Sequence, residues 1–203
     1  MRFTLLSILL LAATGINAQN FEVGVNAGMA VEYHNLGKNE ANTNYSAYAI
    51  DAIYTRKAWQ YGIDLGYRTH VFSGVSTFLD MPIDNGGSVF VTKVPFHMED
   101  REIPLKIFMN RQKSLGKFIV YGGLSMGYCS FHDKATLNWY GKDMSQYYDN
   151  NFALVGLQAG ATWFATKHIG INAEVAGAYN FTFANVLRGD MSYPLTFGIR
   201  YRL

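Results

Sequence analysis

Seven charged residues share one side of alternating polar and apolar segments, and they are the first candidates for chemistry. They are Asp51, Asp64, Arg68, Glu102, Lys106, Glu174 and Arg200. A charge removed from water is costly unless an opposite charge pairs with it. Because the set contains both carboxylates and cations, we expect these side chains to pair with one another. The main hypothesis is a salt-bridged network that fills an interior. A gated polar path or a proton-linked switch is the alternative.

Catalysis and metal binding have weaker support. His70 and Ser73, with Asp80 or Asp84 beyond them, could supply a base, a nucleophile and an orienting acid. Their spacing specifies no geometry, however. The remaining histidines are scattered over different connections without a metal-ligand spacing, and they are His97, His132 and His168. We therefore expect no enzyme activity, no cofactor and no metal.

Alternation with a period of two predicts the elements that must carry the charges. It recurs in eight segments, at about 21–33, 45–56, 59–72, 101–110, 118–130, 152–165, 169–181 and 196–203. Pro104 is unexpected in the fourth segment, because proline cannot donate to a strand ladder. The pattern predicts an all-β chain with eight antiparallel strands.

The last segment indicates a membrane environment. Its odd-numbered residues form an unbroken apolar face, whereas Arg200 and Arg202 lie on the other face. Such a strand is typical of a transmembrane β-barrel with lipid outside and a polar interior. Thr196, Gly198, Tyr201 and Leu203 also match the C-terminal insertion signal of bacterial outer-membrane barrels. We therefore expect the bacterial outer membrane as the location, with its lipid and the barrel assembly machinery as partners.

The N-terminal segment and the composition agree with export. Residues 1–18 have a positive start, an apolar run and a small residue, Ala18, at their end, which is the pattern of a removed signal peptide. Residues 19–203 would then form one barrel domain. Aromatic residues make up 15% of the chain and charged residues only 16%, below the roughly 25% of typical soluble domains. The formal net charge of only +2 gives no reason to expect nucleic acid as a partner. The single cysteine, Cys129, cannot form an internal disulfide.

Connection lengths predict the topology. Short joints near 57–58, 111–117 and 166–167 alternate with longer stretches at 34–44, 73–100, 132–150 and 184–190. This alternation predicts a single eight-stranded antiparallel transmembrane β-barrel with short periplasmic turns, longer extracellular loops and both termini in the periplasm. Side chains just fill a barrel of this size, so we expect a packed interior.

Two of the longer stretches have features of their own. Residues 88–96 alternate like a strand, which predicts a hairpin rising above the membrane. The next stretch is rich in aromatic residues that either contact a partner or belong to an interfacial aromatic girdle. These residues are Trp139, Tyr140, Tyr147 and Tyr148.

A family resemblance rests on four segments: 101–106 with the sequence REIPLK, the glycine-rich 121–128, 170–174, and the terminal 198–201. Together they resemble the small outer-membrane β-barrel family of Bacteroidetes that includes PorT-like proteins, barrels of the OmpA/OmpX type. The resemblance implies the fold, the compartment and tolerance of Pro104. It implies little about activity, although PorT itself is associated with secretion.

Two classes of function stay open. In the first, the protein has a structural or protein-interaction role in the envelope, such as that of an accessory of a secretion or assembly machine. In the second, it is a lipid-modifying enzyme or a narrow pore. The absence of a recognisable catalytic constellation favours the first class.

Overall fold

The computed structural model describes residues 20–36, 39–80, 90–139, 142–182 and 185–203. The signal segment predicted at 1–18 lies outside this part of the chain. The strands are β1 (Phe21–Leu36), β2 (Asn39–Arg56), β3 (Trp59–Asp80), β4 (Phe90–Leu115), β5 (Phe118–Trp139), β6 (Lys142–Phe164), β7 (Ile169–Thr182) and β8 (Asn185–Arg202). Within the described residues, no helix is long and apolar enough to cross a bilayer.

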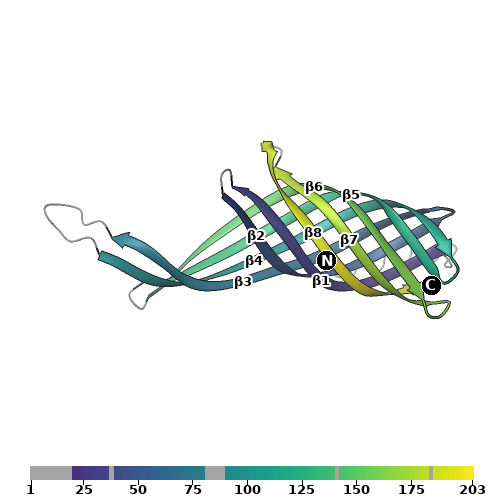
Figure 1. Ribbon diagram of the computed structural model, residues 1–203, viewed down its shortest axis with the longest axis horizontal. Helices are drawn as coiled ribbons and strands as arrows, with labels where there is room; N and C mark the ends of the chain where they lie inside the picture. Colours follow the sequence, from purple (N-terminus) through teal and green to yellow (C-terminus); the bar gives the residue numbers. More distant parts are fainter. Residues whose placement is uncertain (1–19, 37–38, 81–89, 140–141, 183–184) are drawn as a thin grey trace, which may run out of the picture.

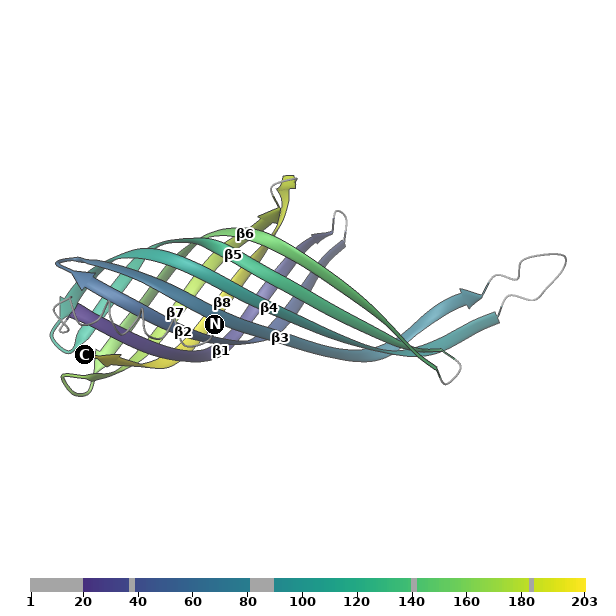
Figure 2. The same ribbon diagram turned by 180° about the vertical axis from the view of Figure 1, so that it is seen from behind.

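The eight strands form a closed antiparallel barrel in which each strand pairs with its neighbours in sequence (Figure 1). The ring closes between β1 and β8, where Glu22 lies opposite Arg202 and Leu203 N donates to Phe21 O at 3.0 Å. The view from behind in Figure 2 shows the same tilted strands on the far wall. The predicted eight-stranded all-β fold is therefore confirmed. Closure gives each described strand a partner on both sides, as a bilayer requires.

The strands at one end are longer than the sequence pattern predicted. The predicted third and fourth strands ended at 72 and began at 101, yet pairing of β3 with β4 continues from Val71 opposite Glu99 to Asp80 opposite Phe90. Much of the stretches 34–44, 73–100, 132–150 and 184–190 is likewise paired strand. Backbone pairing can continue where side-chain alternation fades, which explains the difference. The β3–β4 hairpin consequently extends well beyond the other strands (Figure 1). A hairpin was predicted at 88–96, and the described residues of that range, 90–96, belong to this hairpin.

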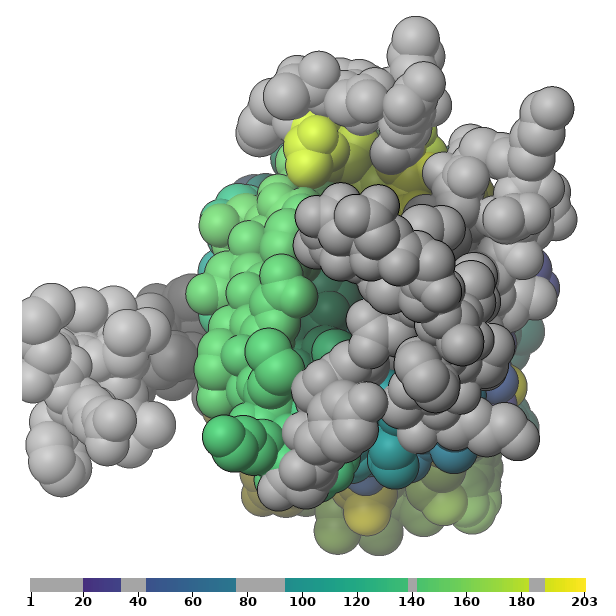
Figure 3. All heavy atoms as spheres, turned by 90° about the vertical axis from the view of Figure 1, so that its left-hand side faces the viewer, coloured from purple at the N-terminus to yellow at the C-terminus, as the bar shows by residue number. Residues whose placement is uncertain are grey.

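The opposite end has the short connections. Lys57 and Gly116 adopt positive φ values of 57° and 67° in the turns after β2 and β4. Such values suit two-residue hairpin turns, and glycine adopts them without a Cβ penalty. The described C-terminus lies at this end (Figure 1). Figure 3 looks onto the other end, where β6, in green, forms one side of the barrel.

The outer face of the barrel is apolar and the inner face is polar, as β4 illustrates. Its outward residues Ile103, Leu105, Ile107 and Met109 are 40–57% exposed, whereas residues 102, 104, 106, 108 and 110 are buried. Arg101 and Arg111 bracket the four outward apolar residues. A band of this length and polarity is typical of the lipid-facing wall of a transmembrane barrel, so residues 102–110 form the membrane-spanning part of β4.

Pro104 fits the barrel because of the strand beside it. Pairing of β3 with β4 runs to Leu65 opposite Leu105 and resumes at Arg68 opposite Glu102. At the intervening Gly66, an added Cβ would lie 2.7 Å from Pro104 Cγ. The glycine thus leaves room for the proline ring at the point where the ladder lapses.

Candidate functional site

Two ion pairs connect β3 and β4 inside the barrel. Arg68 Nη1 donates to Glu102 Oε2 at 3.1 Å, and it also lies 3.3 Å from Ser192 Oγ of β8. The second pair lies four residues away from the first on each strand, with Lys106 Nζ 3.3 Å from Asp64 Oδ1. All four charged residues are less than 9% exposed, and each pair faces across the strands in register. The structure thus brings four of the predicted network residues together as two buried pairs.

Arg200 of β8 is the centre of a third group. Its Nη2 lies 3.0 Å from Tyr121 Oη, 3.7 Å from Glu174 Oε2 and 3.8 Å from Asp51 Oδ2. Its Nη1 donates to Thr162 Oγ1 at 3.2 Å. The guanidinium carbon also lies 4.9 Å from the centroid of the Tyr121 ring, within cation–π range. Arg200 is only 1% exposed, so these partners replace the hydration of its two terminal nitrogens, whereas its Nε has no hydrogen-bond partner.

Neutral polar side chains extend this group across the barrel. Asn26 Nδ2 donates to Asp51 Oδ2 at 2.7 Å, and Asn172 Nδ2 donates to Asn26 Oδ1 at 3.3 Å. Thr162 Oγ1 donates to Asn172 Oδ1 at 2.9 Å. The sequence analysis missed Asn26, Tyr121, Thr162 and Asn172 as members of the network. Their common signal was an inward position on a strand, which a search restricted to charged residues passes over.

The end with the short turns is closed by another pair. Arg202 donates to Glu22 Oε1 at 2.9 and 2.6 Å, and its guanidinium carbon lies 3.9 Å from the centroid of the Phe164 ring. Further along the interior, Asn180 Nδ2 donates to Glu32 Oε1 at 2.7 Å. Polar contacts therefore occur along the described length of the interior.

Little free volume separates these contacts near the middle of the barrel. A hollow lined by Asp64, Arg68, Lys106 and Glu174, among others, has a volume of about 30 Å³. A cavity of this size holds about one or two water molecules. The arrangement can therefore hold charges in fixed pairs, and it offers no space for a solute there.

The mouth at the end with the long hairpins contains a different arrangement of acids. Asp100 and Asp133 lie opposite each other on β4 and β5, beyond the membrane-spanning residues. Burial, together with the charge of Asp133, raises the pKa of Asp100 to about 6. His70 lies near enough to oppose this shift, and Glu102 adds to it. A neighbouring carboxylate disfavours the charged form of a buried acid in this way.

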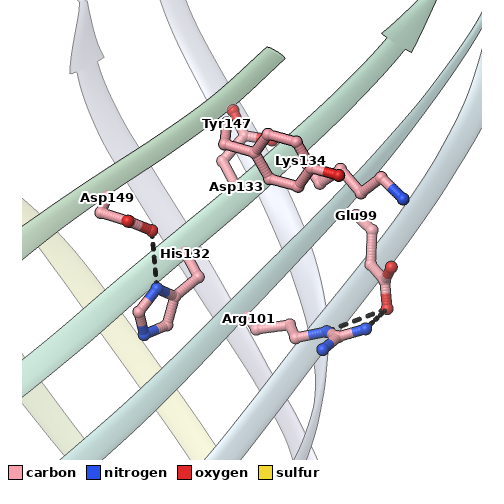
Figure 4. Close-up of a pocket in the computed structure, with 7 residues that line it drawn as sticks. All are labelled: Glu99, Arg101, His132, Asp133, Lys134, Tyr147 and Asp149. Carbon is pink, nitrogen blue, oxygen red and sulfur yellow. Dashed lines mark hydrogen bonds and ion pairs between the residues drawn. The ribbon is translucent and has the colours of Figure 1, made fainter. Parts of the chain in front are cut away.

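A cluster of charged and polar residues lies beside this mouth on β4, β5 and β6; we call it the outer-rim cluster (Figure 4). It lines a hollow of about 390 Å³ and consists of Glu99, Arg101, His132, Asp133, Lys134, Tyr147 and Asp149. Arg101 Nε donates to Glu99 Oε1 at 3.0 Å, and this pairing lowers the pKa of the Glu99 carboxyl. His132 Nδ1 lies 2.7 Å from Asp149 Oδ1. The sequence analysis did not single out this cluster.

The aromatic residues predicted in a loop lie partly on a strand. Tyr147 and Tyr148 belong to β6 and are 69% and 55% exposed. The Tyr147 ring centroid is 5.7 Å from Lys134 Nζ, and the Tyr148 ring lies 6.5 Å from that of Phe131. Tyr140 and the side chain of Trp139 lie outside the described residues. The described pair is therefore presented by a paired hairpin rather than by a loop.

The residues of the predicted insertion signal lie on both faces of β8 and, for Leu203, directly after it. Tyr201 and Leu203 are 48% and 40% exposed on the outer side, and the Tyr201 ring stacks on His168 at 5.9 Å. Thr196 and Gly198 occupy the inner phase, where Gly198 lies against Asn26.

The triad considered for His70 and Ser73 is not assembled, and that alternative is wrong. His70 Nδ1 contacts Asn44 O at 2.7 Å, whereas Ser73 Oγ contacts His97 Nδ1 at 2.8 Å. The reason is the strand period, which directs residues 70 and 73 to opposite faces of β3. The side chain of Asp80 and all of Asp84 lie outside the described residues.

This protein has the architecture of a transmembrane β-barrel: a closed ring of eight strands with an apolar wall and a charged interior.

Neither a family model nor a curated protein matches this chain. Among solved structures, it is similar to a major outer membrane protein from Thermus thermophilus, with a TM-score of 0.54 and 13% identity over 90% of this chain and 98% of that one. Neisserial surface protein A gives a TM-score of 0.48 and 14% identity, covering 91% and 97%. Ail of Yersinia pestis, solved with the heparin analogue sucrose octasulfate, gives 0.49 and 12%, covering 91% and 99%. The Thermus protein supports the fold, and the PorT-like resemblance stays a prediction.

Proposed function

We propose that this protein is an integral barrel of the bacterial outer membrane with a sealed interior. The observation that carries the proposal is the combination of an apolar outer wall with buried ion pairs at the barrel centre. Lipid can solvate the wall, whereas the interior pairs occupy the space that a solute would need. Export by the N-terminal segment and insertion through Thr196, Gly198, Tyr201 and Leu203 agree with this location. Both termini would then lie in the periplasm, on the side of the short turns.

A structural or protein-interaction role fits such a sealed barrel, with the hairpins outside the membrane as the contact surface. Tyr147 and Tyr148 are large, exposed and held by strand pairing, which lowers the entropic cost of ordering them on a partner. As neighbours on β6 they point to opposite faces, so each offers a separate contact. The PorT-like resemblance favours a partner in a secretion or assembly machine. Nucleic acid is not expected.

Membrane fractionation tests the location. The processed protein should be recovered with the outer membrane and should migrate differently in SDS gels before and after boiling, because a closed barrel resists detergent. Recovery in the soluble periplasm, together with identical migration in both gels, contradicts the proposal.

Affinity capture from native outer membranes tests the interaction role. The wild type should retain an envelope protein that a Tyr147→Ser, Tyr148→Ser variant loses. A Tyr193→Ser variant is the matched control, since Tyr193 is an exposed tyrosine on β8 that packs edge-on against Tyr33 at 5.6 Å. Equal capture by all three proteins argues against a contact through Tyr147 or Tyr148.

A further inference from the structure

Three residues outside the barrel interior form a continuous hydrogen-bonded chain. Ser130 and His132 are two residues apart on β5 and therefore lie on the same, outward face. Asp149 of β6 lies opposite His132 in the strand register. Ser130 Oγ is 3.2 Å from His132 Nε2, and His132 Nδ1 is 2.7 Å from Asp149 Oδ1.

This chain has the order and geometry of a nucleophile, a base and an orienting acid. With the ring proton assigned to Nδ1, His132 donates to the Asp149 carboxylate, and its Nε2 lone pair is left to accept the Ser130 hydroxyl proton. The Ser130–His132 distance is at the long end of the hydrogen-bonding range, which is common in unliganded active sites. Ser130 and His132 would be catalytic, and Asp149 would be a positioning residue.

We propose that Ser130, His132 and Asp149 form the active site of an acyl-ester hydrolase that acts on membrane lipids. This activity goes beyond the function proposed above. It rests on that proposal in one respect, that lipid surrounds the barrel wall. It also develops the lipid-modifying class that the sequence left open, at residues that the sequence did not identify.

The depth of the site points to a lipid substrate. Ser130 lies opposite Ile103, the outermost apolar residue of the β4 wall, whereas His132 lies opposite Arg101, which begins the charged outer rim. The site thus lies at the boundary between the apolar band and the polar rim. Ester groups of membrane lipids occupy the same boundary, between their acyl chains and their head groups.

The surroundings of Ser130 suit both parts of such a lipid. Towards the membrane centre, the outward residues of β5 are Tyr128, Met126 and Leu124, all 49–58% exposed. Met126 and Leu124 also line an apolar hollow of about 370 Å³ on the outer wall, which could receive an acyl chain. On the polar side, Arg101 and Lys134 of the outer-rim cluster could contact a phosphate group of the head.

The reaction is a hydrolysis and needs only water as co-reactant. Ser130 Oγ attacks the ester carbonyl carbon while its proton passes to His132 Nε2. The bond to the lipid alcohol breaks, the alcohol leaves with that proton, and the acyl group stays on Ser130. Water then attacks the acyl-serine, His132 again takes and returns a proton, and the products are one fatty acid, one deacylated lipid and free enzyme.

The chain contains a natural control for this geometry. Ser73 and His97 form another contact between a serine and a histidine, at 2.8 Å, on the hairpin beyond the membrane wall. This contact joins β3 to β4, whereas the proposed site joins β5 to β6. Ser73→Ala therefore removes a comparable hydroxyl without touching the proposed site.

The first experiment is covalent labelling with a fluorophosphonate, which reacts with activated serines. Wild type and Ser73→Ala, both refolded in vesicles, should label equally, whereas Ser130→Ala and His132→Ala should lose at least ~100-fold in labelling rate. Heat-modified migration in SDS gels confirms that each variant is folded. Labelling that is absent in the wild type, or unchanged in Ser130→Ala, overturns the proposal.

The second experiment measures fatty acid released from vesicles of phosphatidylethanolamine and phosphatidylglycerol, with and without lipopolysaccharide. Mass spectrometry of the released chain identifies which lipid class carries the ester. Asp149→Asn should lower kcat by roughly 10²–10⁴ with little change in KM, and it should move the acidic limb of the pH–rate profile to lower pH, because the imidazolium loses its counter-charge. No release from either vesicle overturns the proposal. Release by a protein that fractionates outside the outer membrane would instead refute the proposed location and leave the hydrolase standing.

Discussion

The contribution of an ion pair to stability depends on whether its residues are buried, and Arg68 is a buried example. Glu102→Gln would remove the carboxylate from the buried guanidinium and leave it the neutral hydroxyl of Ser192. Breaking a buried pair costs about 3–5 kcal/mol, so we expect the free energy of unfolding to fall by about that amount. Urea unfolding in lipid vesicles, followed by tryptophan fluorescence, measures this change.

The ion pair between Glu99 and Arg101 is the matched control, since it lies on the same strand but on the outer rim. Water and salt screen such a pair, so Glu99→Gln should leave the unfolding midpoint nearly unchanged. Equal effects of Glu99→Gln and Glu102→Gln would mean that the interior is hydrated rather than sealed.

Asp100 gives a prediction about pH. Its folded pKa, about 6, lies above the ordinary value of 3.8, because burial and Asp133 disfavour its charge. A raised carboxyl pKa means that the folded state holds the proton more tightly. Its contribution to stability is therefore fully present below about pH 4 and is lost as the pH rises through about 6.

We expect Asp100→Asn to raise the melting temperature at pH 7.5 by a few degrees and to flatten its pH dependence between pH 4 and 7. The groups that face Asp100 are Asp133, His70 and Glu102. His70→Gln removes the side chain that opposes the raised pKa of Asp100 and serves as a comparison. A wild-type melting temperature that rises steadily from pH 4 to 7.5 would contradict the assignment.

On the strand β8 the outer face is apolar and the inner face polar, and the end of this strand tests the insertion signal. Tyr201→Asp with Leu203→Asp places two charges on the outer side, which costs up to a few kcal/mol each, less near the interface. We expect the double variant to fail to insert and to be degraded. Immunoblots of outer-membrane fractions measure this loss.

Arg202→Lys is the control for that strand, because residue 202 lies on the inner side and lysine keeps the charge opposite Glu22. This variant should reach the membrane at close to wild-type levels. Normal levels of folded double variant would show that neither Tyr201 nor Leu203 is recognised during assembly.

The strands also show what sequence alone can reveal. Alternation predicted the wall and the inward phase of Asp64 and Lys106, because lipid and interior impose opposite requirements on neighbouring residues. It underestimated the length of β3 and β4, because outside the membrane both faces meet water and alternation need not continue along the whole strand; residues 88–96 kept it, but the sequence did not join them to the strand at 101–110. The Ser130–His132–Asp149 chain was hidden for another reason: it depends on the register that places Asp149 opposite His132.

Considered as a whole, the barrel has an excess of acid among its described inward residues. Six buried carboxylates, Glu22, Glu32, Asp51, Asp64, Asp100 and Glu102, accompany three buried cations, Arg68, Lys106 and Arg200, in this part of the chain. Any open path through this interior would therefore favour cations. The fixed pairs and the small central hollow argue that no such path is open.

Conductance across planar bilayers tests this closed state. The purified wild type should give no stable, porin-like current, because an interior of eight strands is filled by its own side chains. Glu174→Gln should lower the melting temperature, since Arg200 loses one of its two nearby carboxylates while its own charge stays buried. The barrel should nevertheless stay closed, because Asp51 and Tyr121 still hold Arg200. A steady wild-type current, with Glu174→Gln altering ion selectivity at unchanged stability, would replace the sealed barrel by a narrow cation pore.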